Sequence, residues 1–325
     1  MSGAAHSDPS DGVVLGRGFG HGKVILVGEH AVVHGYAALA VGISTGVSVE
    51  ARAGSGRLSV PAWSLEAAAG DGSAVGRALA AIVGRLETPG LDFRADAQIP
   101  SRAGLGSSAA LAVAIARAAA AATGRGDDGG AIDDAVARAE AVFHGNPSGI
   151  DAAAARTGLA GTFTRADGWR PVPVLQAMTL CIGLSGRPRD TAAQVAAVGR
   201  LRERLPVAGD ILALLGRLAD DARGALGLGD VDGLGRIFDV AHGLLAALRV
   251  SSPELEVLVH GARAAGAVGA KLTGAGGGGS VVALAPTLSA SDAILAAWKA
   301  EGFDGFLASV VPDARGRELE NGRAP

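Results

Sequence analysis

The sequence predicts a chain of two domains that both mix helices with strands, and three observations support this prediction. The chain has 325 residues, of which 49% are hydrophobic and 19% are charged, so it is globular and long enough for two cores. Strand patterns dominate the first 60 residues, whereas residues 190–265 are patterned as helices. Strand and helix patterns alternate again from residue 269. We expect a lead-in at 1–12, a first domain at 13–170 and a second at 171–325.

The first domain is predicted to be a strand-rich sheet with helices. Its lead-in is polar and rich in Gly and Ser, and we expect it to be disordered. Short β-branched runs and an alternating segment predict strands at residues 23–27, 37–41, 47–50, 57–60 and 91–98. Helical periodicity or an alanine-rich composition predicts helices at 74–86, 109–123 and 132–143.

The second half begins with two strands, predicted at 158–164 and 172–184, with the hairpin signal Asp167-Gly168 between them. Four helical segments are expected from residue 190 to 265, because Gly and Pro punctuate that stretch. The punctuating residues are Pro206, Gly209, Gly227-Leu228-Gly229 and Ser251-Ser252-Pro253. The remaining elements are predicted as strands at 269–273, 280–284 and 305–311 and a helix at 290–300.

Charge and cysteine content exclude several classes of function. The net charge is −3, which argues against a nucleic-acid binder but leaves a nucleotide binder open. The single cysteine, Cys181, stands in an apolar run and is predicted to be a core residue. Without a possible disulfide within the chain, a reducing cytoplasm is the expected compartment. No signal peptide or membrane span is predicted.

A Gly-rich loop at residues 100–110 is the most informative stretch. It ends in the pair Ser107-Ser108 and leads into an alanine-rich run. A loop that feeds the start of a helix leaves backbone N–H groups pointing one way, and the helix dipole adds positive charge there. The stretch is therefore a candidate phosphate site. One hydroxyl can cap the helix, and the other can reach a phosphate oxygen or a metal.

Two other glycine clusters fail the tests for common nucleotide motifs. Residues 16–23 have Arg17 and Val24 where a Walker loop needs Gly and Ser or Thr. Residues 274–279 satisfy Gly-x-Gly-x-x-Gly, but the strand-like residues 280–286 follow instead of a helix, so a dinucleotide site is not favoured.

Two polar constellations allow more than one interpretation. His30 and His34 stand four residues apart after Glu29. In a zincin the glutamate follows the first histidine, so this order does not match a zinc site. The better interpretation places Glu29 and His30 on a substrate-facing loop after a strand. Near Glu140 and Asp151, a helix is expected to end, turn and restart with Ser148 as N-cap. Helix capping and the helix dipole can explain Ser148 and Asp151 without any function. A solvated helix face can explain Glu140 in the same way. The residues alone therefore leave a chemical role open.

Four motifs nevertheless resemble the mevalonate kinase family of the GHMP kinase superfamily, in family order. The two specific ones are Glu29-His30-Ala31-Val32-Val33-His34-Gly35, within residues 22–35, and His144-Gly145-Asn146-Pro147-Ser148-Gly149-Ile150-Asp151. The phosphate loop at 100–110 and the run Lys271-Leu272-Thr273-Gly274-Ala275-Gly276-Gly277-Gly278-Gly279 resemble the superfamily more generally.

The resemblance implies an α/β N-terminal domain and an α+β C-terminal domain, with the active site in the cleft between them. It implies ATP-dependent phosphorylation of the primary hydroxyl of mevalonate, in isoprenoid biosynthesis, with Mg²⁺ as metal. Asp151 would accept the hydroxyl proton beside Lys23, while Ser108 and Glu140 would hold Mg²⁺. ATP would contact Pro100, Gly104, Leu105, Gly106, Ser107, Ser108 and Ala109. Substrate would contact Lys23, Glu29, His30, Asp151, Thr191, Gly274 and Ala275.

The sequence departs from the fuller family pattern in two places, and alternatives remain. Gly20-His21 precedes the first motif instead of Ala-Pro, and the long insertion of animal enzymes is missing, which puts isoprenoid-diphosphate inhibition in doubt. The alternatives are a kinase for phosphomevalonate or homoserine, a diphosphomevalonate decarboxylase, or a non-catalytic nucleotide-binding protein. No nucleic-acid or membrane partner is expected, and the family suggests a homodimer.

Overall fold

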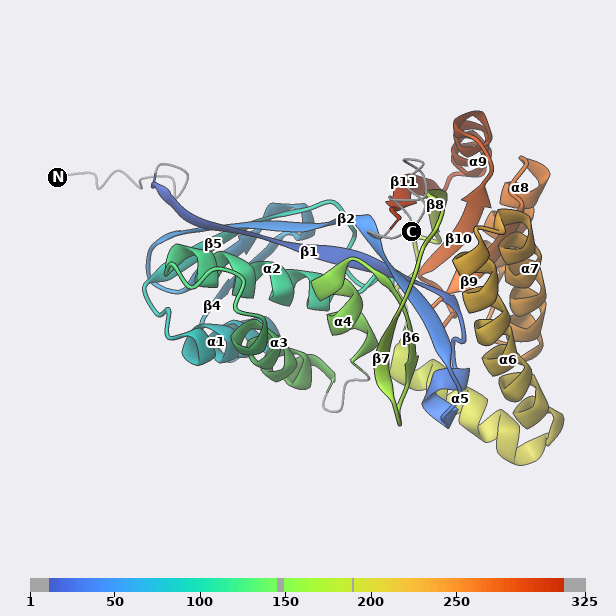
Figure 1. Cartoon of the computed structure of the whole chain (residues 1–325), viewed down its shortest axis with the longest axis horizontal. Coiled ribbons are helices and arrows are strands. Elements are labelled where there is room, and N and C mark those ends of the chain that lie inside the picture. The colour runs from blue at the N-terminus through green and yellow to red at the C-terminus, as the bar shows by residue number, and fades with distance from the viewer. Residues whose placement is uncertain (1–11, 145–148, 189, 313–325) are drawn as a thin grey trace, which may run out of the picture. The chain divides into compact units, whose positions relative to one another are not determined.

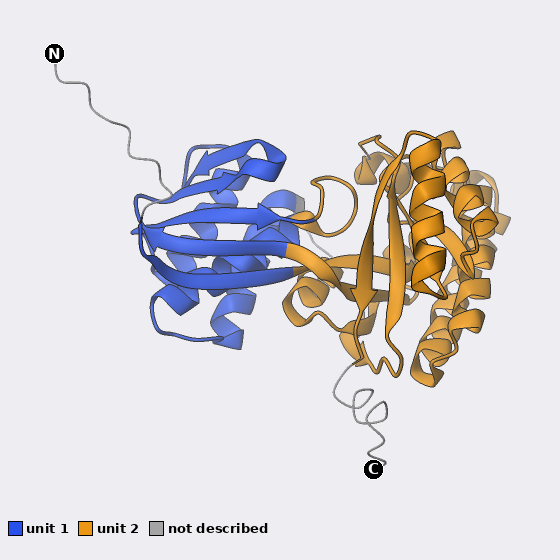
Figure 2. Cartoon of the chain, turned by 90° about the horizontal axis from the view of Figure 1, so that it is seen from above, with its two compact units in different colours: residues 1–20, 47–98, 108–147 blue, residues 21–46, 99–107, 148–325 orange. Residues whose placement is uncertain are grey.

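The computed structural model describes residues 12–144, 149–188 and 190–312, and most of the predicted lead-in lies outside them. The chain forms two compact units, which Figure 2 colours separately. Unit 1 comprises residues 1–20, 47–98 and 108–147, and unit 2 comprises residues 21–46, 99–107 and 148–325. The units interleave along the chain, and the division at residue 170 stays a prediction.

Unit 1 contains a sheet, α-helices and a short 3₁₀ helix (Figure 1). Its strands run in the order β4-β3-β5-β2, where β5 is antiparallel to β2 and parallel to β3. The strands are β1 (Val14–Val27) and β2 (Ala38–Ala53), which both continue into unit 2, with β3 (Arg57–Val60), β4 (Leu65–Ala68) and β5 (Leu91–Ala97). The helices are η3 (Pro61–Trp63), α1 (Ala74–Leu86), α2 (Ser107–Ala122) and α3 (Gly129–His144).

Strand β1 is longer than its β-branched run predicts, because three alternate glycines extend it. A Cβ atom on Gly16, Gly18 or Gly20 would collide with the carbonyl oxygen of Ala118, Ala114 or Ala110, respectively. Two residues of strand advance about 6.7 Å and four residues of helix about 6 Å, so the two backbones stay in step. The first glycine cluster is thus a packing surface for α2.

The first part of unit 2 is a three-stranded section in the order β2-β6-β7. It includes η2 (Ala31–His34), α4 (Ile150–Thr157), β6 (Ala160–Thr164) and β7 (Gly168–Val172). The prediction of one strand over 172–184 is wrong, because β7 ends at Val172 and β8 (Met178–Leu184) begins six residues later in another sheet. Pro173, which has no N–H to donate to a ladder, follows β7 directly.

The second part of unit 2 is an antiparallel sheet in the order β11-β8-β10-β9 with helices packed against it (Figure 1). The four helices expected from residue 190 onward are confirmed, although Gly209 lies inside one of them. They are α5 (Thr191–Arg204), α6 (Val207–Leu228), α7 (Val231–Ala247) and α8 (Pro253–Ala264). The remaining elements are β9 (Gly269–Thr273), β10 (Ser280–Ala285), α9 (Leu288–Ala300) and β11 (Asp304–Val310).

Cys181 lies fully buried in β8, where burial raises the pKa of its thiol to about 12. This confirms that it is a core residue, since the thiolate is the nucleophilic form. Within the described ranges, none of the helices has the length and apolar character needed to cross a membrane.

Candidate active site

Lys23 and Asp151 form an ion pair in unit 2. Lys23 lies in the buried half of β1, and its side chain is 3% exposed, whereas that of Asp151 is 30% exposed. The Lys23 Nζ lies 3.0 Å from the Asp151 Oδ1 and donates to the carbonyl oxygen of Gly104 at 3.3 Å. A buried ammonium therefore joins a partly open carboxylate to the Gly-rich loop.

Helix α4 places Asp151 in its first turn. The N-cap of this helix is Gly149, with φ of 88° and no side-chain cap, and the predicted cap, Ser148, lies outside the described residues. A left-handed backbone at the N-cap favours glycine. Asp151 also stands where the helix dipole favours a negative charge.

The Gly-rich loop holds a left-handed backbone at Gly104 and Gly106, with φ of 89° and 70°. Two further hydrogen bonds hold the loop to other parts of unit 2, because Leu105 O accepts from Lys23 N at 2.9 Å and Ala103 O accepts from Ser280 Oγ at 2.9 Å. A Cβ atom on Gly106 would lie 3.0 Å from the Lys23 Cγ. The loop thus packs on the side chain that reaches Asp151.

The loop ends where the sequence predicts, since α2 begins at Ser107, two residues before the predicted start. Pro100 and Leu105 belong to the same loop, and Leu105 is fully buried. Ser108 and Ala109 are in the first turn of α2, in unit 1. The start of a 16-residue helix therefore follows the loop directly, as a phosphate site of this kind requires.

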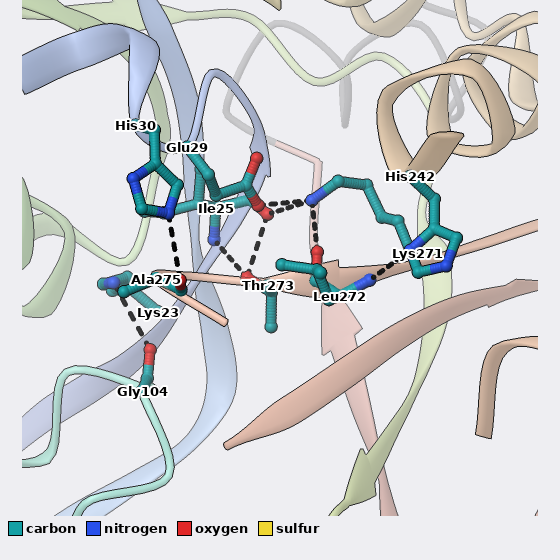
Figure 3. A network of polar contacts seen from close by, with 10 residues as sticks. All are labelled: Lys23, Ile25, Glu29, His30, Gly104, His242, Lys271, Leu272, Thr273 and Ala275. Carbon is teal, nitrogen blue, oxygen red and sulfur yellow. Dashed lines mark hydrogen bonds and ion pairs between the residues drawn. The ribbon is translucent and has the colours of Figure 1, made fainter. Parts of the chain in front are cut away.

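Glu29 and Lys271 form a second ion pair in unit 2, which is buried on both sides (Figure 3). Their side chains are 1% and 0% exposed, and the Lys271 Nζ donates to the Glu29 Oε1. The Glu29 Oε2 is buried and has no hydrogen-bond partner within the described part of the chain. Burial lowers the pKa of Lys271, and the neighbouring carboxylate of Glu29 opposes that shift.

His30 connects the first motif to the last one. It is 4% exposed, and its Nε2–H donates to the carbonyl oxygen of Ala275 at 2.9 Å. Thr273 adds a second link, because its hydroxyl donates to Ile25 O at 3.0 Å and accepts from Ile25 N at 3.2 Å. Residues 248 positions apart in the sequence are thereby held together in one unit.

The third glycine cluster is a turn between two antiparallel strands, β9 and β10. Its glycines have positive φ, at Gly274, Gly276, Gly277, Gly278 and Gly279. Strand β10 begins at Ser280, which confirms the strand predicted after this cluster, whereas a dinucleotide fingerprint leads into a helix.

His242 is a site neighbour that the sequence did not reveal. It is 3% exposed, and its Nδ1 accepts from the Leu272 N–H at 3.3 Å while Nε2 lies 3.3 Å from the carboxylate of Glu256. Burial lowers the pKa of His242, and the carboxylate of Glu256 partly opposes this shift. A lone histidine in a helical pattern carries no signal of such contacts, because they join three separate elements.

Two further predicted residues stand on other elements. Glu140 lies in α3 of unit 1 and is 3% exposed, so its interpretation as a solvated surface residue is wrong. Thr191 is exposed as the first residue of α5, where Asp190 caps the helix by accepting from Ala193 N at 2.9 Å. No group of three or more His, Cys, Asp or Glu side chains among the described residues could hold a metal.

Comparisons with known proteins agree with this geometry. The family model for the N-terminal domain of GHMP kinases matches residues 73–158, and the model for the C-terminal domain matches residues 222–304. The first match includes the Gly-rich loop and Asp151, and the second includes Lys271 and the third glycine cluster. Both matches support the predicted mixed α/β and α+β fold.

Individual relatives are more specific. The mevalonate kinase of Aeropyrum pernix is 36% identical over 285 residues, which cover 81% of this chain and 86% of the relative. That of Pyrococcus horikoshii is 33% identical over 293 residues, with 81% and 87% covered. The crystal structure of L. major mevalonate kinase in complex with R-mevalonate is 31% identical, with a TM-score of 0.83 over 95% of this chain and 99% of that one. The chain therefore belongs to the mevalonate kinase family of the GHMP kinases.

Proposed function

We propose that this chain transfers the γ-phosphoryl group of ATP to the primary hydroxyl of mevalonate, giving 5-phosphomevalonate and ADP. The observation that carries the proposal is the 3.0 Å contact of the Lys23 Nζ with the Asp151 Oδ1, beside a Gly-rich loop that opens a helix. Family membership narrows the acceptor from small alcohols in general to mevalonate.

Asp151 is the proposed general base. Its carboxylate is partly exposed and can accept the proton of a substrate hydroxyl, while Lys23 fixes its orientation. Phosphoryl transfer has a loose transition state, so the protein mainly positions groups and stabilises charge. Lys23 supplies a fixed positive charge beside the base and thereby favours an oxyanion at the attacking oxygen.

Glu29 and His30 are proposed to hold the substrate. The Glu29 Oε2 is buried without a hydrogen-bond partner within the described ranges, and such an atom costs free energy unless a ligand donates to it. A hydroxyl of mevalonate can supply that donor. The hydrogen bond from His30 to Ala275 O holds Ala275 next to His30. We propose further substrate contacts at Gly274, Ala275 and Thr191.

The residues present fit ATP and Mg²⁺. Gly104 and Gly106 have left-handed backbones at the entrance to α2, which frees N–H groups for phosphate oxygens. The Ser108 hydroxyl and the buried Glu140 carboxylate are oxygen donors of the kind that Mg²⁺ prefers. When bound, Mg²⁺ would neutralise charge on the phosphates.

An ADP-release assay with a panel of alcohols tests the proposal. The panel is mevalonate, phosphomevalonate, homoserine and galactose, each with ATP and Mg²⁺. We expect mevalonate to have the highest kcat/KM by at least about 100-fold, because a site built for one set of polar groups rejects analogues that leave them unpaired. A higher kcat/KM for another alcohol would reassign the acceptor. ATP binding without ADP release from any alcohol would favour a non-catalytic protein.

Two further expectations concern the cellular location and the oligomeric state of the chain. A cytoplasmic location is supported by the single cysteine, Cys181, which leaves no disulfide possible within the chain. The homodimer that the family suggests stays a prediction, and sedimentation equilibrium of the purified chain would test it.

A further inference from the structure

Lys271 is a buried lysine that the proposed chemistry does not use. It lies in β9, a strand whose five residues are all buried, and its own side chain is 0% exposed. Burial of an ammonium is costly unless it is paired and hydrogen-bonded. A lysine kept at such a position therefore calls for a reason beyond packing.

We propose that Lys271 is a positioning residue that holds the Glu29 carboxylate in place and aims its free oxygen at the substrate. This inference rests on the proposed function, because it names what holds the substrate-binding group in place. Lys271 acts through Glu29 and does not itself contact substrate.

The hydrogen bonds of Lys271 support this division of roles. An ammonium has three N–H donors, and the Lys271 Nζ has three acceptors, namely the Glu29 Oε1, Leu272 O at 2.7 Å and Ile25 O at 3.4 Å. Its donors are thereby used within the protein. Figure 3 shows these contacts converging on the nitrogen from β1, from the segment after β1, and from β9.

The hydrogen bonds of Glu29 are complementary. Its Oε1 receives the ammonium, whereas its Oε2 is buried without a partner within the described ranges. A purely structural buried pair would be expected to satisfy both carboxylate oxygens, since an unsatisfied one is costly. The asymmetry indicates that one oxygen is fixed by Lys271 and the other is kept for a ligand.

Three further groups lie near the pair. The Phe238 ring lies 5.9 Å from the Lys271 Nζ, within the range of a cation–π contact. His242 approaches through the N–H of Leu272 with an unprotonated Nδ1, so it adds no positive charge there. His30, the next residue after Glu29, is tied to Ala275 O. Among the residues that the structure describes, Lys271 is thus the cation in direct contact with Glu29.

Kinetics of three variants give the first test of the inference. In Lys271→Met the carboxyl of Glu29 loses its countercharge, and we expect KM for mevalonate to rise about 10- to 100-fold at pH 7, the worth of one charge-assisted hydrogen bond. KM for ATP should stay within about twofold of the parent value. Lys271→Arg should restore most of the affinity. The control is Lys299→Met, which removes an exposed lysine paired with Asp304 and should leave both constants unchanged.

A double variant separates positioning from a structural role. In Glu29→Gln/Lys271→Met, KM for mevalonate should equal that of Glu29→Gln alone, because Lys271 acts through the Glu29 carboxylate. Equal losses toward ATP and mevalonate, or additive effects in the double variant, would each overturn the inference.

A measurement without turnover keeps this test distinct from the proposed function. In the parent without ATP, mevalonate should shift the ¹³C carboxyl resonance of Glu29, which is identified by its loss in Glu29→Gln, and mevalonate should bind about 10- to 100-fold more weakly to Lys271→Met. If Lys271→Met does not fold, Lys271→Arg should still bind mevalonate and show the same shift. A parent that binds mevalonate but releases no ADP would overturn the function alone. A Glu29 resonance that mevalonate does not shift, or unchanged mevalonate affinity in Lys271→Met, would overturn the role of Lys271.

Discussion

Replacement of Gly106 by alanine should slow catalysis far more than it destabilises the fold. Gly106 has φ of 70°, and a left-handed backbone costs alanine about 1–2 kcal/mol. Its new Cβ would also lie 3.0 Å from the Lys23 Cγ, whereas two carbons normally approach to about 3.5–4.0 Å. The stem of Lys23 must therefore move by about 0.5–1 Å. Its Nζ would move with it, away from the contact with Asp151.

The expected loss of activity follows from that displacement. A misplacement of about 1 Å in an active site can cost about 100-fold in rate, so we expect kcat of Gly106→Ala to fall about 10- to 100-fold. This corresponds to about 1.4–2.7 kcal/mol of lost transition-state stabilisation. The assay is ADP release at saturating ATP and mevalonate, with the Tm measured on the same preparation.

Gly168→Ala is the matched control for backbone strain. Gly168 also has φ of 70°, it opens β7, and a Cβ atom there would have nothing within 4 Å. Both variants should lose about 1–2 kcal/mol of folding stability, and only Gly106→Ala should lose kcat. A Gly106→Ala enzyme with kcat within twofold of the parent would refute the argument. An equal loss of kcat in Gly168→Ala would attribute the effect to destabilisation.

Three further predictions concern the base, the metal and a buried histidine. Asp151→Asn should lower kcat by about 10²–10⁴-fold, the usual contribution of a general base, and near-full activity in a steady-state assay would exclude that role. Glu140→Gln should raise the Mg²⁺ concentration for half-maximal rate, and an unchanged Mg²⁺ titration would count against its role as a ligand. Burial lowers the pKa of His242 from 6.5, so its contribution to stability is present above about pH 6.5 and is lost as pH falls toward the lowered pKa. His242→Asn should therefore show a smaller fall in Tm than the parent between pH 7.5 and pH 5, and parallel melting curves would contradict this.

Local chemistry made much of the fold predictable. Helix α1 spans the predicted residues 74–86, because apolar periodicity and end signals are properties of neighbouring residues. The turn from the Gly-rich loop into α2 was predictable for the same reason. The long glycine-bearing part of β1 was not, since Gly16, Gly18 and Gly20 resemble a flexible loop until the backbone of α2 packs against them.

The candidate site divides in the same way. The sequence by itself determined which motifs are present, and with them the family, because Glu29, His30 and Asp151 stand in short, specific strings. Only the tertiary structure decided their partners. Lys271 pairs with Glu29 across 242 residues, and a sequence does not state which of its many charged side chains will meet. Burial is what gives such a pair its significance, because removing both charges from water makes each dependent on the other.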